Sequence, residues 1–386
     1  MTTPLDAEVA ARIERHGPLH LDEVLDLALY DPDHGFYGAG AGSAGRRGDF
    51  LTSPEVGPLF GAVVARALDT WWHELGRPDP FTVVEAAAGA GTLARAVLLA
   101  EPACASALTY VLVERSAALR GRQAEYLSLF DASMAFPPGD PDDSDDETHA
   151  RPDSTGGGPR VVSLPDLPAV RVTGVVLANE LLDNLAFRLL ERGAAGWLEV
   201  RVGLGEADGS PTLVETLVAA EAGDATLADR LAPDAPTGGR VPIQRQAAAW
   251  VSEALDRLER GHLLVIDYAS SAPTMADRPW TDWVRTYRRH DRGLAPLAEL
   301  GTQDVTCEVD LAQLALVRPP DGVASQATFL GAHGLDELVA EGRHIWRERA
   351  HIGDLAALRA RSRVGEAEAL VDRAGLGAFL VLHWQV

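Results

Sequence analysis

The sequence predicts an α/β fold in which a wound, mostly parallel sheet forms the core. The first observation is a succession of strand, loop, helix, strand and helix between residues 81 and 130, which is how a parallel sheet with right-handed crossovers begins. The second is that two later apolar runs, 174–180 and 261–268, also have strand length and end at or beside an acidic residue. A chain of 386 residues can hold two to three domains of about 150 residues, or one large domain with insertions.

A helical extension is predicted to precede the core over residues 1–75. Apolar residues recur at close to a 3.6-residue period over 5–30, which is typical of a helix with one buried face. The pattern is helical again from Pro54, a residue that suits the first turn of a helix because its missing N–H would have no partner there. We therefore expect the core to occupy residues 76–386.

The clearest unit of the chain begins at Phe81. Residues 81–85 have the composition of a short buried strand, and a loop of small residues separates them from a helix that starts at Thr92. Residues 108–114 predict a second strand that ends in Glu114, followed by a helix from 116 to 130. The carboxyl ends of parallel strands meet at one edge of the sheet, which is where open α/β sheets bind their ligands.

Two segments are predicted to interrupt this core. Residues 131–159 are rich in Asp, Pro and Gly and contain nothing that could form a core, which predicts a disordered acidic insertion. Residues from about 186 to 240 contain two strand-like runs and a Pro/Gly-rich stretch, and we interpret them as an inserted substrate subdomain. A helix over 243–260 leads back into the core, and 379–384 is the last predicted strand.

The composition of the chain excludes several kinds of binding site. The formal net charge is −23, from 57 acidic and 34 basic residues, which argues against a nucleic-acid-binding surface. Such a charge either serves solubility or favours a cationic ligand or basic protein partner. The two cysteines, Cys104 and Cys307, exclude a disulfide framework and a cysteine zinc site, and no metal site is predicted. The acidic start of the chain and the lack of a long apolar run predict a cytoplasmic protein without membrane insertion.

The loop after the first strand predicts a nucleoside cofactor. Gly89 and Gly91 lie between a strand and a helix, where glycine lets a ligand approach the backbone and the free N–H groups of the helix. Glu114, at the end of the next strand, can accept hydrogen bonds from both hydroxyls of a ribose. This local pattern fits NAD and S-adenosylmethionine alike. Glu85 favours the second, because its carboxylate would attract an ammonium group and repel a pyrophosphate.

Three more acids, Glu180, Asp183 and Asp267, follow later strands and are expected at the same edge of the sheet. Each of them alone is equally well explained as a solvated loop carboxylate or a helix cap. As a group they again favour S-adenosylmethionine over NAD.

The chain contains several short sequence motifs that are specific enough to compare with known families. The most specific are Gly48–Val56, which reads GDFLTSPEV, and Ala178–Asn184, which reads ANELLDN. Further motif residues, given in chain order, are Val113–Ser116, Leu119, Arg120, Gln123, Ile266–Tyr268, Arg285–Tyr287, His290, Gln303–Thr306, Val309, Asp310, Gln326, Phe329 and Leu330. Together they resemble the MidA-like family of S-adenosylmethionine-dependent methyltransferases, whose mitochondrial members assist assembly of respiratory complex I by methylating an arginine of a subunit.

This resemblance implies a class I methyltransferase (Rossmann-like) fold with a seven-stranded, mostly parallel sheet, and S-adenosyl-L-methionine as cofactor. It implies methyl transfer to a protein side chain, with arginine as the expected acceptor. Glu180 and Asp183 are the first candidates for holding the guanidinium and accepting its proton, and Asp49 and Glu55 follow. The residues expected at the cofactor are Thr52, Ser53, Glu85, Gly89, Gly91, Glu114 and Asn179.

The glycine turn departs from the family pattern ELGPGRGTL. Residues 85–93 read EAAAGAGTL, so that Ala87 stands where the family has its first glycine, and two further alanines replace its proline and arginine. Because alanine tolerates a positive φ poorly, we expect an altered affinity for the cofactor. A weakly active relative that serves as an assembly or binding protein therefore remains an alternative, and so does a nicotinamide dehydrogenase.

Overall fold

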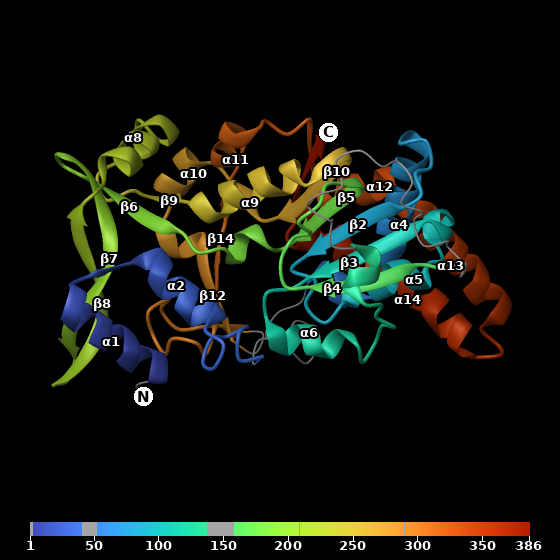
Figure 1. The fold of residues 1–386 in the computed structure, drawn as a ribbon, viewed down its shortest axis with the longest axis horizontal. Helices are drawn as coiled ribbons and strands as arrows, with labels where there is room; N and C mark the ends of the chain where they lie inside the picture. Colours follow the sequence, from blue (N-terminus) through green and yellow to red (C-terminus); the bar gives the residue numbers. More distant parts are fainter. Residues whose placement is uncertain (1–2, 41–51, 137–157, 208, 289–290) are drawn as a thin grey trace, which may run out of the picture.

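The computed structural model describes residues 3–40, 52–136, 158–207, 209–288 and 291–386. Its largest sheet has seven strands in the order β16-β17-β10-β5-β2-β3-β4 (Figure 1). In chain order they are β2 (Phe81–Ala86), β3 (Leu108–Val113), β4 (Arg160–Leu164), β5 (Val172–Asn179), β10 (Leu258–Asp267), β16 (Gly322–Ser325) and β17 (Leu380–Gln385).

This sheet has the predicted, mostly parallel arrangement. The strands from β4 to β10 are parallel to their neighbours, whereas β17 is antiparallel to both β10 and β16. The chain proceeds outward from β2 through β3 to β4 and then returns to place β5 on the other side of β2. The strand order therefore reverses between β2 and β5, and open α/β sheets bind ligands at such a switch point.

Helices cover both faces of the sheet. On one face pack α4 (Pro58–Glu74), α5 (Thr92–Leu99), α12 (Gln326–Ala332), α13 (Leu335–Arg349) and α14 (Leu355–Leu370); on the other pack α9 (Arg245–Asp256) and α11 (Leu311–Val317). Val83 belongs to the first core and its neighbour Val84 to the second, because successive side chains of a strand point to opposite faces. Burial on both faces explains why β2 reads as a continuous apolar run.

A second sheet lies at the other end of the molecule (Figure 1). Its strands are β1 (Leu19–His20), β6 (Arg188–Gly193), β7 (Gly196–Ala207), β8 (Ser210–Ala219) and β9 (Arg240–Ile243). The strand-like runs predicted within 186–240 correspond to β6 and β7. The helices α1 (Pro4–His16) and α2 (Leu21–Tyr30) share one core with this sheet, where Leu5 and Leu25 pack with Leu189.

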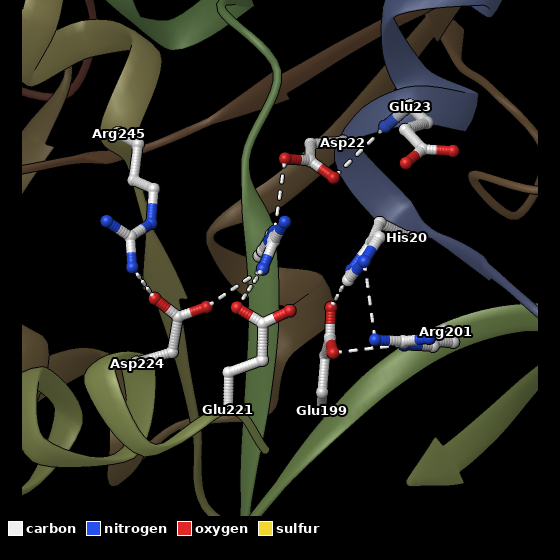
Figure 2. A network of polar contacts seen from close by, with 9 residues as sticks. His20, Asp22, Glu23, Glu199, Arg201, Glu221, Asp224 and Arg245 are labelled. Atoms are coloured by element: carbon white, nitrogen blue, oxygen red, sulfur yellow. Dashed lines mark hydrogen bonds and ion pairs between the residues drawn. The ribbon is translucent and has the colours of Figure 1, made fainter. Parts of the chain in front are cut away.

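Ion pairs connect α2 with this second sheet (Figure 2). Arg188 of β6 contacts Asp22 of α2 at 3.3 Å and Asp224 of α8 (Ala222–Leu231) at 3.2 Å. Asp224 also pairs with Arg245, the first residue of α9. The buried Asp224 therefore connects β6 with α9, and Arg188 extends this network to α2.

Some predicted boundaries are wrong. The helix expected over 5–30 is two helices, because Gly17 has a φ of 81° and Pro18 follows it. The helix expected over 116–130 ends early, as α6 (Ala117–Gln123). The acidic insertion begins later than residue 131, because the Asp131 side chain caps the short helix α7 (Ala132–Ala135). Most of that insertion, 137–157, lies outside the described residues.

The remaining elements are short. They are α3 (Ser53–Val56), α10 (Ala272–Ala276), β11 (Ala269–Ser270), β12 (Val284–Arg288), β13 (Asp291–Arg292), β14 (Asp304–Cys307) and β15 (Val309–Asp310). No helix in the described part of the chain is both long and apolar enough to cross a membrane.

Candidate active site

A cleft of about 1440 Å³ opens at the carboxyl ends of β2, β3 and β5. Three strand-end acids line it, namely Glu85, Glu114 and Glu180, together with Asn179. It thus lies at the switch point of the sheet. Small-molecule sites usually occupy about 300–1,000 Å³, so this cleft can hold a cofactor and leave space beside it.

The turn after β2 carries three positive φ angles. They are 53° at Ala87, 52° at Gly89 and 84° at Gly91, after which α5 begins directly at Thr92. At Gly91 the positive φ favours glycine, whereas the nearest atom to an added Cβ, at 2.7 Å, is the tip of the flexible Leu127 side chain, which can move away. Ala87 adopts the left-handed conformation without being glycine, at a cost of roughly 1–2 kcal/mol. The replaced glycine of the family pattern is therefore a strained position.

Glu114 is buried behind this turn and is well supplied with donors. Its Oε2 accepts a hydrogen bond from the Gly89 N–H at 2.9 Å, and its Oε1 accepts one from the Ser116 N–H at 2.7 Å. Burial raises the pKa of Glu114, and these two N–H groups act against that rise. A carboxylate has about four acceptor positions, so two remain for hydroxyls of a ligand.

Gln123 completes the support of the turn from α6. Its Nε2 donates to the Gly89 carbonyl at 2.8 Å, and its Oε1 accepts from the Ser163 hydroxyl of β4 at 2.5 Å. Both polar backbone groups of Gly89 are thus fixed by side chains from outside the turn.

Glu85 lies beneath the turn at the end of β2. Its Oε2 accepts a hydrogen bond from the Tyr110 hydroxyl at 2.7 Å. Burial raises the pKa of Glu85 to about 8, so this carboxyl holds a proton at neutral pH until a cation reaches it. An ammonium ion beside Glu85 would favour its ionised form, and the role predicted from the sequence stays a prediction.

The motif segment around α3 is only partly described, and Asp49 lies outside the described residues. Thr52 and Glu55 line the cleft, and Glu55 accepts a hydrogen bond from the Thr92 hydroxyl at 3.0 Å. Ser53 is fully buried, and its hydroxyl donates to Gln326 Oε1 at 2.8 Å instead of lining the cleft. The backbone N–H of Ser53 donates to Glu180 Oε1 at 3.4 Å.

Two helices from the end of the chain hold this segment in place. Gln326, at the start of α12, contacts Ser53 and donates to the Leu370 carbonyl at 3.0 Å. Glu366 of α14 accepts the N–H of Leu59 at 2.9 Å. It thereby replaces the missing side-chain cap of α4, whose N-cap residue is Gly57.

Four buried carboxyls lie close enough to interact on the β5 side of the cleft: Glu180, Asp183, Asp267 and Asp304. Burial and then Asp267 raise the pKa of Glu180 to about 8. Burial, followed by Asp267 and Glu180, raises the pKa of Asp183 well above its usual range. Asp183 Oδ1 has no hydrogen-bond partner among the described residues, although the side chain is almost fully buried.

Asp267 fixes the loop that carries these acids. Its Oδ2 accepts the N–H groups of Leu182 at 2.8 Å and Asp183 at 3.3 Å, and its Oδ1 accepts that of Tyr268 at 2.9 Å. Burial raises the pKa of Asp267 to about 7, against the effect of these donors. Glu180 lines the cleft, whereas Asp183 lies behind it.

Among the cleft residues that were not singled out from the sequence as site residues are Tyr30, Tyr37, Arg115 and Asn184. The tyrosine hydroxyls donate to the Asn184 carbonyl and to its Oδ1, at 3.4 and 3.3 Å respectively. Asn184 Nδ2 donates in turn to Asp304 Oδ1 at 3.1 Å. Asn184 closes the motif stretch Ala178–Asn184, which is a signal that could have identified it.

The fold and this strand-edge cleft are those of a class I methyltransferase. A family model for S-adenosyl-L-methionine-dependent methyltransferases matches residues 63–326, and the chain belongs to this family. The resemblance noted in the sequence is therefore confirmed.

The structural comparison identifies the cofactor. A crystal structure of a protein from Burkholderia thailandensis bound to S-adenosyl-homocysteine is 27% identical, covers 99% of this chain and 92% of its own, and superposes with a TM-score of 0.77. The chain is an S-adenosyl-L-methionine-dependent methyltransferase. The remaining acceptor positions of Glu114 fit the hydroxyls of this cofactor, and the Glu85 carboxyl, which a nearby cation would ionise, fits its ammonium group.

Two named relatives match most of the chain. The protein arginine methyltransferase NDUFAF7 homolog, mitochondrial, of Drosophila melanogaster is 29% identical over 315 residues, which is 79% of this chain and 68% of that protein. The protein arginine methyltransferase NDUFAF7, mitochondrial, of Homo sapiens is 28% identical over 350 residues, which is 86% of this chain and 74% of that protein.

Proposed function

We propose that this chain methylates an arginine side chain of a protein. The observation that carries the proposal is the pair formed by Glu180 and Asp183. Glu180 is a buried carboxyl on the wall of the cleft, and the Asp183 carboxyl near it keeps an unpartnered oxygen. Two relatives are named as protein arginine methyltransferases, which supports the same acceptor.

A guanidinium group fits the charge of this region. It stays protonated in proteins, and its planar fork of N–H donors matches carboxylate oxygens. Burial and then the neighbouring Asp267 raise the pKa of both carboxyls, to about 8 for Glu180, so that Glu180 is mainly protonated at neutral pH without a cation. A bound guanidinium would shift them towards the ionised form, and the ion pair would offset part of the desolvation of both partners.

The reaction also needs a site for one proton. S-adenosylmethionine supplies a methyl group on a positively charged sulfur. The acceptor nitrogen forms a bond to this methyl carbon as the carbon–sulfur bond breaks, and the nitrogen then loses one proton. Glu180 lines the cleft, and its pKa of about 8 lies close to neutrality, which suits a group that takes up this proton and releases it to water.

The other cleft residues are assigned to the cofactor. Glu114 would receive the ribose hydroxyls, and the turn at Gly89 and Gly91 would receive the amino-acid end together with Glu85. Thr52, Asn179 and Glu55 line the same cleft and complete its wall. Ser53 acts through its N–H on Glu180, because its hydroxyl is bound to Gln326.

The test is methylation by the purified chain of soluble protein from a strain that lacks it, with tritiated S-adenosylmethionine as the methyl donor. The expected result is label on one or a few proteins, with peptides heavier by about 14 Da per methyl group at arginine. The Glu180→Gln variant should bind S-adenosyl-homocysteine normally in calorimetry and transfer label at least about 100-fold more slowly. Label on another type of residue, or no label despite normal cofactor binding, would contradict the proposal.

The strained Ala87 favours one alternative, a relative that retains the fold and works as an assembly or binding protein. The same calorimetry separates the two functions. A wild-type chain that fails to bind S-adenosylmethionine at high micromolar concentration would favour this alternative.

A further inference from the structure

The loop end of the hairpin of α13 and α14 has a charge opposite to that of the whole chain. These residues, 343–363, contain six arginines and two acids, so their formal charge is +4 within a chain of −23, whereas the complete hairpin from Leu335 to Leu370 has six arginines and seven acids. We call these residues the basic tip. Figure 1 shows the hairpin at one end of the molecule, opposite the sheet of β7 and β8. A local charge of this sign on so acidic a protein attracts a negatively charged partner at close range.

Large apolar side chains are exposed within the basic tip. Ile352, Leu355 and Leu358 are 56%, 63% and 51% exposed, and all three lie within seven residues. Single exposed leucines are common, whereas clustered ones mark surfaces that bind other molecules. Arginines around an apolar centre are also characteristic of protein–protein interfaces.

This apolar cluster leads into the active-site cleft. Leu355 and Leu358 are followed on α14 by Arg359 and Ser362, at helical spacings that place the four on neighbouring positions of one face. Arg359 and Ser362 line the cleft. A molecule bound on Leu355 and Leu358 would therefore lie beside the part of the cleft that Arg359 and Ser362 line.

Several guanidinium groups of the basic tip are available to a partner. Arg349 pairs with Asp354, and Arg363 pairs with Glu341 at 2.9 Å. The side chains of Arg343 and Arg359, in contrast, make no hydrogen bond or ion pair with another described residue. Arg347 contacts only the backbone carbonyl of Arg343, at 3.3 Å.

We propose that the basic tip is the docking surface for the protein substrate, and that it binds an acidic segment with an apolar side chain next to the arginine that is methylated. This inference rests on the proposed function, because it requires a protein as methyl acceptor. The two charged regions would then orient the substrate: its acidic segment binds the arginines of the tip, and its arginine enters the cleft towards Glu180. An anionic membrane fits less well, because it would repel the remaining, strongly acidic surface.

The test compares two pairs of variants in the methylation assay described above, with soluble protein from the deletion strain as acceptor. Arg343→Glu/Arg347→Glu removes charge from the tip, and Leu355→Ser/Leu358→Ser removes its apolar centre. Matched controls lie on the second sheet and its helices: Arg15→Glu/Arg230→Glu, where Arg15 also contacts only a backbone carbonyl, and the exposed Leu217→Ser. None of these residues lines the cleft.

We expect each tip variant to lower methyl incorporation about tenfold or more, with controls within about twofold of wild type. Calorimetric affinity for S-adenosyl-homocysteine should be unchanged in all of them. Incorporation by the wild type should fall with added salt, and less so in the charge-reversed variant. Tip variants that methylate like the wild type would overturn the docking surface and leave the proposed function standing.

Two further outcomes separate the possibilities. If the wild type labels no protein arginine while it binds the cofactor, the proposed function fails and the docking surface fails with it. If the wild type co-sediments with phosphatidylglycerol vesicles, the tip variants do not, and methylation is unaffected, the tip is a membrane contact and the proposal is overturned.

Discussion

On the β3 side of the cleft, the Glu114 carboxylate receives the backbone N–H groups of Gly89 and Ser116, whereas on the β5 side the Asp183 carboxyl has an oxygen without a partner in the described structure. Both side chains are buried, at 7% and 3% exposure. The neighbours differ in kind. Glu114 is surrounded by donors from the turn, and Asp183 by other acids, chiefly Asp267 and Glu180.

This difference shows on which side of the cleft the carboxylate is already stabilised before a ligand binds. Backbone N–H groups stabilise a carboxylate without needing a counter-ion, so the β3 side is ready to accept hydroxyl groups. The β5 side holds several carboxyls at close quarters, and such groups stay protonated until a cation binds. We therefore expect substitutions on the β5 side to change turnover, and those on the β3 side to change cofactor affinity.

The largest effect is expected for the β5 side. Glu180→Gln and Asp183→Asn should each reduce turnover by about 10²–10⁴-fold, the usual contribution of a group that moves a proton. Affinity for S-adenosyl-homocysteine, measured by calorimetry, should be nearly unchanged. Because both substitutions mimic the protonated carboxyl, thermal unfolding should occur at the wild-type temperature or above it. A variant that unfolds at a lower temperature would show that its carboxylate stabilises the fold.

The pH dependence of the free energy of unfolding tests whether the buried carboxyls on the β5 side are protonated. The pKa of Glu180 is about 8 in the folded chain against an ordinary 4.5, so between these values the folded state keeps a proton that the unfolded chain has lost. The free energy of unfolding should therefore fall as pH rises, by up to about 1.4 kcal/mol per pH unit for each such carboxyl. Glu85, with a pKa of about 8, contributes in the same direction.

Urea unfolding at about pH 5, 6, 7 and 8 measures the slope of the free energy of unfolding against pH. Glu180→Gln should make the slope less steep, and the same change at the exposed Glu125 should leave it as in the wild type. A slope that Glu180→Gln does not alter would mean that this carboxyl is already ionised in the folded protein.

A smaller effect is expected on the β3 side. Glu114→Ala removes the acceptor of the Gly89 and Ser116 N–H groups and of the cofactor hydroxyls, and should weaken cofactor binding by roughly 1–3 kcal/mol. Calorimetry with S-adenosyl-homocysteine measures this loss, while turnover at saturating cofactor should change little. Unchanged affinity would show that the ribose lies elsewhere. Glu114→Gln keeps one acceptor oxygen and should give an intermediate affinity.

Local sequence patterns were sufficient to predict the position of the strand-end acids and of the glycine turn. A buried apolar run followed by an acid placed Glu85, Glu114 and Glu180 at the correct edge of the sheet, because strand direction and burial determine both. The glycine pattern likewise located the turn, and Ala87 does have the positive φ of the glycine it replaces. These features depend on neighbours in the chain, which a single sequence displays.

Local pattern could not supply partners that are distant in the chain. The Ser53 hydroxyl was expected at the cofactor, yet it binds Gln326, which is 273 residues away. Tyr37 reaches Asn184 across 147 residues. The pairing of β1 with β7, Leu19 opposite Val202, joins the N-terminal helices to the inserted strands in the same way. In each of these cases tertiary packing decides the contact, and no spacing rule encodes it.

The smallest effect is expected at the strained turn itself. Ala87→Gly relieves roughly 1–2 kcal/mol of left-handed strain, but glycine loses more conformational entropy on folding, so the net change in stability should be small. The Ala87 side chain is exposed and lines the cleft, so its removal also clears space at the cofactor. We expect binding of S-adenosyl-homocysteine to tighten a few-fold, with turnover unchanged because Glu180 lies on the other side of the cleft.

Ala90→Gly is the matched control, because Ala90 is in the same turn without a positive φ. There glycine adds flexibility and relieves no strain, so cofactor binding should weaken slightly or stay the same. Tighter binding in both variants would indicate that the cleft only needed space. Tighter binding in Ala87→Gly alone would assign the difference to the backbone conformation, and would mean that this chain loses cofactor affinity at the one turn position where alanine replaces a glycine of the family pattern.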